Sequence, residues 1–153
     1  MTGGMRITLL GTGTPAPSLE RQSSGYLVEV AGDTLVFDHG PGAHHRLIES
    51  GRRAVDVTRA FFTHLHYDHF MDYARLALQR WDMGAGQIDD LDVYGPPPIA
   101  RLSGLLFDDD GVFGPDIRAR VEQRRRRRGF RTGEPGTKCR KVGQRALEGP
   151  GGL

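Results

Sequence analysis

Short apolar runs separated by turn residues predict strands in the first half of the chain. Met5–Leu10 (MRITLL) ends at a Gly/Pro-rich turn, and such a compact apolar run is typical of a buried strand. Tyr26–Val30 and Thr34–Phe37 are rich in β-branched and aromatic residues, and their short connection contains Gly32, which predicts a hairpin. Two further strands are predicted at Arg59–Phe62 and Leu91–Tyr94.

Apolar residues with helical spacing occur between these strands. Tyr67–Trp81 has this spacing and predicts a helix shortly after the strand at 59–62. Ala43–Ser50 predicts a short helix that ends at Gly51. Further helices are predicted at Ile99–Phe107 and from Asp116 to Glu122. The alternation of strands and helices indicates an α/β class, and the early hairpin implies a mixed sheet.

The composition changes near residue 122, where we place the boundary of the folded part. Residues 1–121 contain 11 arginines, no lysine and 16 acidic residues, a net charge of −5, whereas residues 122–153 carry +7. The second segment contains five consecutive arginines and seven glycines, with no sustained period of 2 or 3.6. We therefore expect 1–121 to be one domain and 122–153 to be a disordered basic tail.

Two origins of this tail remain open. Its Arg/Gly/Pro-rich composition resembles out-of-frame translation of a GC-rich gene. Alternatively, the segment is a genuine basic arm that contacts RNA phosphates without sequence preference. The pI near 9.0 describes this tail and is no evidence that the folded part binds nucleic acid.

Several features that the sequence lacks bear on the cellular location of the protein. The chain has no run of 18 apolar residues, and its N-terminus lacks the pattern of a secretory signal, so we expect no membrane association. Cys139 is the single cysteine and cannot form an internal disulfide; it is expected to be a bystander. These features favour the cytoplasm.

Four potential metal ligands fall within six positions after the strand at 59–62. His64 and His66 are two apart, so in an extended backbone their rings project to one side and can reach one cation. Asp68 and His69 follow at the turn into a helix and offer a carboxylate and a third imidazole. Imidazole with carboxylate suits Zn²⁺, and Mn²⁺ or Fe could also be held.

The H-x-H-x-D-H pattern at residues 64–69 resembles the signature of metallo-β-lactamase fold hydrolases. Leu10–Pro15 (LGTGTP) and Phe37–Gly42 (FDHGPG) resemble segments of the ribonuclease Z-like branch of that superfamily. The resemblance covers residues 5–121. It implies the N-terminal half of an αββα sandwich with a mixed sheet. The glycines of 11–13 are explained by a tight turn more simply than by phosphate binding.

The resemblance also implies roles for these residues. His64 and His66 would bind a first zinc, and Asp68 and His69 a second, with Asp68 also accepting a proton in catalysis. Asp38 would lie behind the ligands and orient one of them. In the family, two metals share a hydroxide that attacks a phosphodiester or another ester, and ribonuclease Z is an endonuclease of tRNA 3′ processing. The implied substrate is therefore a phosphodiester, including RNA, or another ester, and a homodimer is one possible state of the full-length family.

Other polar residues have simpler explanations. His39 is expected to be a packed neighbour of the site, and His44 and His45 to be solvated on their short helix. Asp38 could instead cap the turn that starts at Gly40.

The chain lacks part of the family pattern. No histidine follows His69, although the family places further ligands downstream, and the length matches about half of the family's fold. Whether this chain is an enzyme is therefore left open. The alternative is a truncated or frameshifted fragment with an incomplete metal site, or a chain that borrows ligands from another copy. We also expect one apolar face of the sheet to lack a covering layer, which would favour pairing with another chain.

Overall fold

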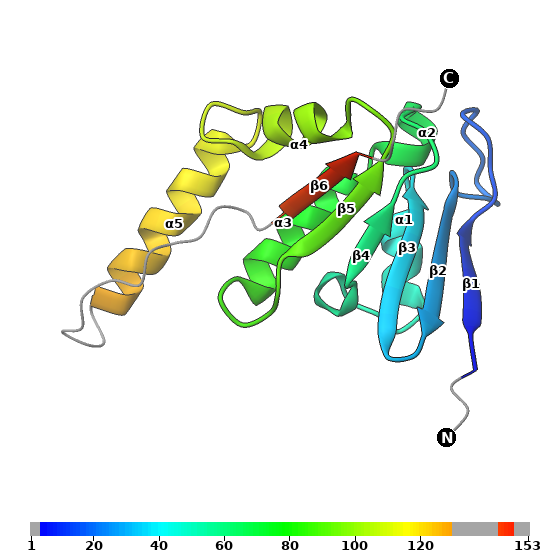
Figure 1. Cartoon of the computed structure of the whole chain (residues 1–153), viewed down its shortest axis with the longest axis horizontal. Coiled ribbons are helices and arrows are strands. Elements are labelled where there is room, and N and C mark those ends of the chain that lie inside the picture. Colours follow the sequence, from blue (N-terminus) through cyan, green and yellow to red (C-terminus); the bar gives the residue numbers. More distant parts are fainter. Residues whose placement is uncertain (1–3, 130–143, 149–153) are drawn as a thin grey trace.

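The protein is built on one mixed sheet of six strands (Figure 1). The computed structural model describes residues 4–129 and 144–148, and the side chains of residues 4–123. In order across the sheet, the strands are β1 (Arg6–Gly11), β2 (Gly25–Val30), β3 (Asp33–His39), β4 (Arg59–Phe61), β5 (Leu91–Gly95) and β6 (Gln144–Glu148). The first three strands pair antiparallel and the others parallel, which confirms the predicted mixed α/β class.

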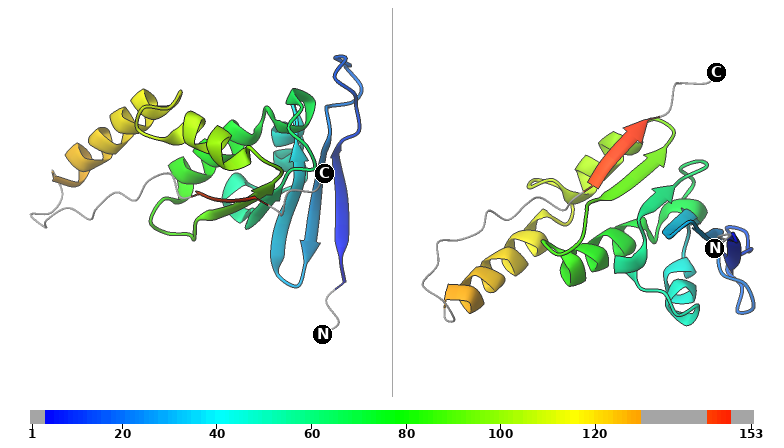
Figure 2. Two further views of the ribbon diagram at one scale, coloured as in Figure 1. Left: turned by 45° about the horizontal axis from the view of Figure 1, so that its top comes forward. Right: turned by 60° about the horizontal axis from the view of Figure 1, so that its bottom comes forward.

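Helices α1 and α3 cover one face of this sheet. The helical elements are α1 (Ala43–Glu49), the short 3₁₀ helix η1 (Ala54–Asp56), α2 (Tyr67–Phe70), α3 (Tyr73–Gly84), α4 (Ile99–Phe107) and α5 (Gly114–Gly129), of which α5 runs away from the strands in Figure 1. Figures 1 and 2 show α1 and α3 on the same side of the strands. The core forms between them: Leu27, Val36, Ala60 and Val93 on the strands, with Leu47 and Leu76 on the helices, are each no more than 1% exposed.

The predicted hairpin is confirmed. Val30 pairs with Asp33, so Ala31 and Gly32 form a two-residue turn. Both have positive φ, 52° and 91°, which is the backbone of a type I′ turn. This turn matches the twist of the flanking strands and fixes their register.

The strand predicted at Met5–Leu10 forms as β1, but the expectation that it is buried was wrong. Ile7 is 56% exposed and Leu9 is 62% exposed, whereas Leu10 is 2% exposed. The reason is the place of β1 at the sheet edge, with one face toward the core and the other toward solvent.

The single helix predicted at Tyr67–Trp81 is divided into α2 and α3. At the division, the Asp72 backbone N–H donates to the His39 carbonyl at 2.9 Å. The Asp72 carboxylate accepts the backbone N–H groups of Gly42, at 2.9 Å, and His44, at 3.1 Å. A long-range clamp on the loop between β3 and α1 therefore replaces one helical hydrogen bond, and no local pattern encodes it.

Regular structure also extends into the segment expected to be disordered. α5 continues past Glu122 to Gly129, and β6 pairs with β5. The remaining tail residues, including Cys139, lie outside the described residues, and the boundary at residue 121 stays a prediction. Within residues 4–129 and 144–148, no helix combines the length and apolar character needed to span a membrane.

Candidate metal centre

The predicted ligands gather at the carboxyl ends of two neighbouring strands. β3 and β4 run parallel with Phe37 beside Phe61, so the segments that follow them emerge side by side. β3 ends with Asp38 and His39, and β4 is followed by the turn that carries His64 and His66. Asp68 and His69 lie on the single turn of α2.

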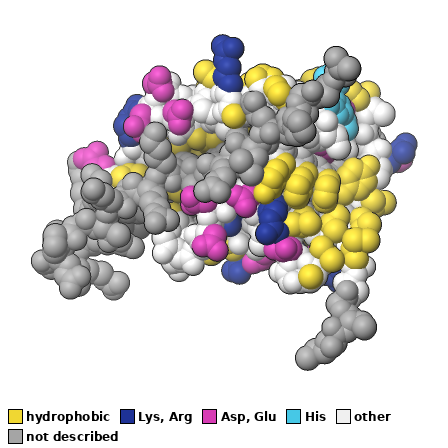
Figure 3. Space-filling model, in the orientation of Figure 1, with side chains coloured by type: hydrophobic (Ala, Val, Ile, Leu, Met, Phe, Trp, Pro, Cys, Tyr) yellow, Lys and Arg dark blue, Asp and Glu magenta, His cyan; other side chains and the backbone are white. Residues whose placement is uncertain are grey.

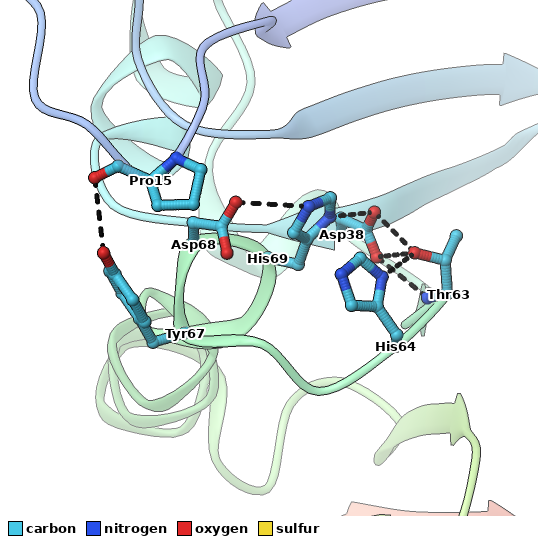
Figure 4. A network of polar contacts seen from close by, with 7 residues as sticks. All are labelled: Pro15, Asp38, Thr63, His64, Tyr67, Asp68 and His69. Atoms are coloured by element: carbon cyan, nitrogen blue, oxygen red, sulfur yellow. Dashed lines mark hydrogen bonds and ion pairs between the residues drawn. The ribbon is translucent and has the colours of Figure 1, made fainter.

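Asp38 joins these segments through its carboxylate (Figure 4). It is 2% exposed and has a left-handed backbone, with φ of 54°. It accepts hydrogen bonds from the Thr63 backbone N–H at 2.8 Å and from the Thr63 hydroxyl at 2.9 and 3.0 Å. It also contacts His69 Nδ1 at 2.7 Å. The Gly40 N–H bonds the Ser24 carbonyl, and the Asp38 carboxylate contacts Thr63 and His69 rather than this turn.

This network assigns the ring tautomers. A carboxylate only accepts, so Nδ1 of His69 carries the proton, and in a neutral ring Nε2 keeps its lone pair. The single proton of the Thr63 hydroxyl goes to Asp38, so this oxygen accepts from His64 Nδ1 at 3.0 Å. Both rings therefore present a free Nε2, as is usual for metal-binding histidines held by a partner at the other nitrogen.

The contact between His69 and Asp68 tests whether a cation fits. His69 Nε2 lies 3.3 Å from Asp68 Oδ2. In the assigned tautomer both atoms are electron-pair donors, so a proton or a metal ion must lie between them to make this contact favourable. Two ligands about 2.0–2.1 Å from one tetrahedral Zn²⁺ are about 3.3 Å apart. Asp68 is 4% exposed, and its Oδ1 has no hydrogen-bond partner in the described part of the chain. This pair therefore fits a divalent metal.

The four predicted metal ligands do not surround a common metal position. The His64 ring lies 4.0 Å from the His69 ring and 4.7 Å from the His66 ring, measured between centroids. His66 itself is exposed. Among the described residues, no group of three His, Cys, Asp or Glu side chains is placed to hold a metal ion. The structure thus assembles a pair of facing ligands and two adjacent rings, which is part of a site.

Sequence reasoning missed two residues beside this cluster. Thr63 bridges Asp38 and His64, and its only sequence signal was its place next to the histidine motif. Gly40 lies against α2, where an added Cβ would be 1.8 Å from the Asp68 carbonyl oxygen. Only glycine fits there, so Gly40 sets how closely the two loops approach each other.

The expectation that His44 is solvated was wrong. His39 and His44 are both 0% exposed, whereas His45 is exposed as expected. His39 Nε2 lies 3.2 Å from His44 Nδ1, and His44 Nε2 contacts the Gln79 side-chain oxygen. Burial lowers the pKa of His39 to about 3 and also lowers the pKa of His44, so both rings are neutral at pH 7.

Known proteins with similar sequences belong to the family that the histidine motif indicates. A sequence model described as the metallo-beta-lactamase superfamily matches residues 19–148. Ribonuclease Z of Mycobacterium sp. (strain KMS) is 32% identical over 117 residues, which are 76% of this chain and 40% of that relative. Ribonuclease Z of Methanothermobacter thermautotrophicus is 35% identical over 104 residues, which are 67% of this chain and 33% of that relative.

Solved structures show the same relationship. The short form of human tRNase Z has a TM-score of 0.55 and 32% identity, covering 63% of this chain and 36% of its own. The metallo-beta-lactamase fold protein YhfI from Bacillus subtilis has a TM-score of 0.63 at 17% identity, covering 95% and 45% respectively, and supports the fold alone. The chain thus spans 33–40% of the length of the two curated relatives described above. By its motif, its fold and the match over residues 19–148, this chain belongs to the metallo-beta-lactamase superfamily.

Proposed function

We propose that this chain carries the N-terminal part of the active site of a zinc-dependent, ribonuclease Z-like hydrolase. The observation that supports this proposal most directly is the 3.3 Å approach of His69 Nε2 to Asp68 Oδ2, two groups that need a proton or a metal ion between them. His64 and His66 would contribute to a second metal position beside the first, and Mn²⁺ or Fe could take the place of zinc.

Bound divalent metals would supply a polarised phosphoryl oxygen and a water of lowered pKa. The protein residues prepare this chemistry. Asp38 holds the His69 ring so that Nε2 faces Asp68, and Thr63 contacts His64 Nδ1, which leaves Nε2 of His64 free. Asp68 is buried and has an oxygen with no hydrogen-bond partner in the described residues, so it is the candidate to accept a proton from the attacking water.

The proposed substrate class is a phosphodiester, and RNA in a tRNA 3′ processing type of cleavage is its first candidate. The support is the identity to ribonuclease Z at 32–35%, over the segment that contains the histidine motif. Other esters remain substrates to be tested. A role in tRNA processing would place the protein in the cytoplasm.

A second candidate function is a fragment that binds metal without catalysis. The absence of a closed group of three ligands among the described residues favours it. Such a fragment would hold one metal through His69 and Asp68 and would not turn over substrate.

Metal analysis and activity measured on the same sample test both candidates. The purified chain is loaded with Zn²⁺ and then assayed with bis(p-nitrophenyl) phosphate and a 3′-extended tRNA precursor. We expect zinc binding that His69→Ala abolishes and that His45→Ala, on the exposed side of α1, leaves unchanged. Turnover lost in His69→Ala supports the hydrolase; zinc binding without turnover supports the second candidate. A folded chain that binds no zinc near pH 7 would contradict both.

A further inference from the structure

Three polar side chains form a hydrogen-bonded series behind the metal centre, on the helix side of the sheet. His39 ends β3, His44 lies on α1 and Gln79 lies on α3. His39 Nε2 is 3.2 Å from His44 Nδ1, and His44 Nε2 contacts Gln79 Oε1. Figure 3 shows histidine rings at the surface, near the end of the sheet that carries α2. His39 and His44 are not among them, because each is 0% exposed.

The hydrogen bonds of this series have one direction. The Gln79 oxygen only accepts, so His44 Nε2 carries the proton of that ring. The neutral His44 ring therefore accepts at Nδ1, and His39 Nε2 donates to it. In the neutral His39 ring, Nδ1 then keeps a lone pair, and this buried atom has no hydrogen-bond partner within the described residues.

This arrangement has a cost that an apolar core residue would not have. A buried nitrogen without a hydrogen-bond partner is unfavourable by about 1–3 kcal/mol. The preceding residue has a second unfavourable feature, because Asp38 takes a left-handed backbone with φ of 54°. That conformation costs a non-glycine residue about 1–2 kcal/mol. Two such costs at adjacent residues call for an explanation in what these residues hold in place.

His39 fixes the backbone on one side of Asp38. Its carbonyl accepts the Asp72 backbone N–H at 2.9 Å, and its ring is held by His44. The backbone N–H of His44 in turn donates to the Asp72 carboxylate at 3.1 Å. Helix α3 therefore grips this segment at two points, through Asp72 directly before its first turn and through Gln79 near its middle.

The Asp38 carboxylate reaches the other way, toward the metal centre. Figure 4 shows this carboxylate between Thr63 and His69, and its distance to His69 Nδ1 is 2.7 Å. A left-handed residue persists only where its surroundings hold it. If the Asp38 backbone relaxed to an extended conformation, its carboxylate would turn away from His69. The direction of His69 Nε2 toward Asp68 therefore depends on the backbone of Asp38.

We propose that His39, His44 and Gln79 are positioning residues for the metal centre. They lock the segment after Asp38 against α1 and α3, so that Asp38 keeps its left-handed conformation and holds the His69 ring. They act through Asp38, because the hydrogen bonds of their side chains run to one another and not to His69. This inference rests on the proposed function, in which His69 takes part in binding zinc.

Gln79 offers the sharpest test, because it is half-buried and ends the series. Gln79→Met keeps the length of the side chain and removes the acceptor for His44. Gln79→Glu keeps an acceptor oxygen and is the conservative variant. Val57→Ala is the matched control, since Val57 is 0% exposed and its side chain makes no hydrogen bond, so the substitution lowers stability and leaves the series intact.

Two measurements separate positioning from stability. The first is the zinc dissociation constant by calorimetry, at a temperature where circular dichroism shows every variant folded. The second is the NMR signal of the His69 Nδ1 proton in the metal-free chain, which the bond to Asp38 protects from exchange. We expect Gln79→Met to weaken zinc binding about tenfold and to lose this proton signal. Gln79→Glu should retain both, and Val57→Ala should lower only the unfolding midpoint.

An unchanged zinc affinity or an unchanged proton signal in Gln79→Met would overturn the proposal, and so would an equal loss in Val57→Ala. If Gln79→Met does not fold, Gln79→Asn breaks the same contact, because its polar side chain is one methylene shorter, and the same outcomes apply. The unmodified chain separates this inference from the proposed function. A chain that binds no zinc contradicts the proposed function, whereas zinc binding that is indifferent to Gln79 contradicts this inference alone.

Discussion

The buried His39 ring makes a defined contribution to the pH dependence of stability. Its pKa is lowered from 6.5 to about 3 by burial, with further lowering from His44 and Arg75. Between these two values the unfolded chain binds a proton at this position and the folded chain does not. Stability from His39 is therefore fully present above about pH 6.5 and is lost progressively as pH falls toward 3.

The size of this effect follows from the two values. One unit of pKa difference corresponds to about 1.36 kcal/mol. A pH of 5 is 1.5 units below the pKa of the unfolded His39 ring, which is then protonated, while the folded ring is still neutral. His39 therefore lowers the free energy of unfolding by about 2 kcal/mol at pH 5.

His39→Gln removes the titrating group and keeps a donor near Nε2, which faces His44 Nδ1. Urea unfolding gives the free energy of unfolding at pH 7.5 and pH 5.0 for both proteins. We expect the decrease on acidification to be about 2 kcal/mol smaller in the variant, whatever its stability at pH 7.5. Equal decreases in the two proteins would refute the assignment of a neutral, buried His39.

Three further predictions concern the metal site and its support. Asp38→Asn should lower zinc affinity about 10–100-fold by calorimetry, because the amide has one acceptor oxygen where both carboxylate oxygens accept hydrogen bonds, from Thr63 and His69, while Asp56→Asn on η1 should have no effect. Gly40→Ala should lower the thermal midpoint by at least about 5 °C, because its Cβ would meet the Asp68 carbonyl at 1.8 Å, whereas Gly4→Ala, with no atom within 4 Å, should not. Saturating Zn²⁺ at about 100 times its dissociation constant should stabilise the chain by about 2.7 kcal/mol, EDTA should reverse this, and an unchanged midpoint would argue against a metal site.

Local chemistry made much of the sheet predictable. The connection at residues 31–33 specifies a tight hairpin because Gly32 takes positive φ freely, and the structure has that turn. The H-x-H-x-D-H motif likewise placed its residues at the end of β4, since a short apolar strand leads directly into it. In both cases the determining residues are close in sequence.

The features that sequence reasoning missed depend on distant contacts. His44 is buried because α1 turns it toward His39 and Gln79, and Gln79 lies on another helix. The break between α2 and α3 arises from the clamp of Asp72 on the loop after β3. The exposure of Ile7 and Leu9 follows from the edge position of β1, which an apolar run alone does not indicate.

Nitrogen-15 NMR of the histidine rings during Zn²⁺ addition tests the central claim most directly. We predict that the Nε2 resonance of His69 shifts to a metal-bound position while its Nδ1 keeps the proton donated to Asp38, and that Asp68→Asn weakens the response. A folded protein in which Zn²⁺ leaves the His69 Nε2 resonance unchanged, or binds through Nδ1, would contradict the account.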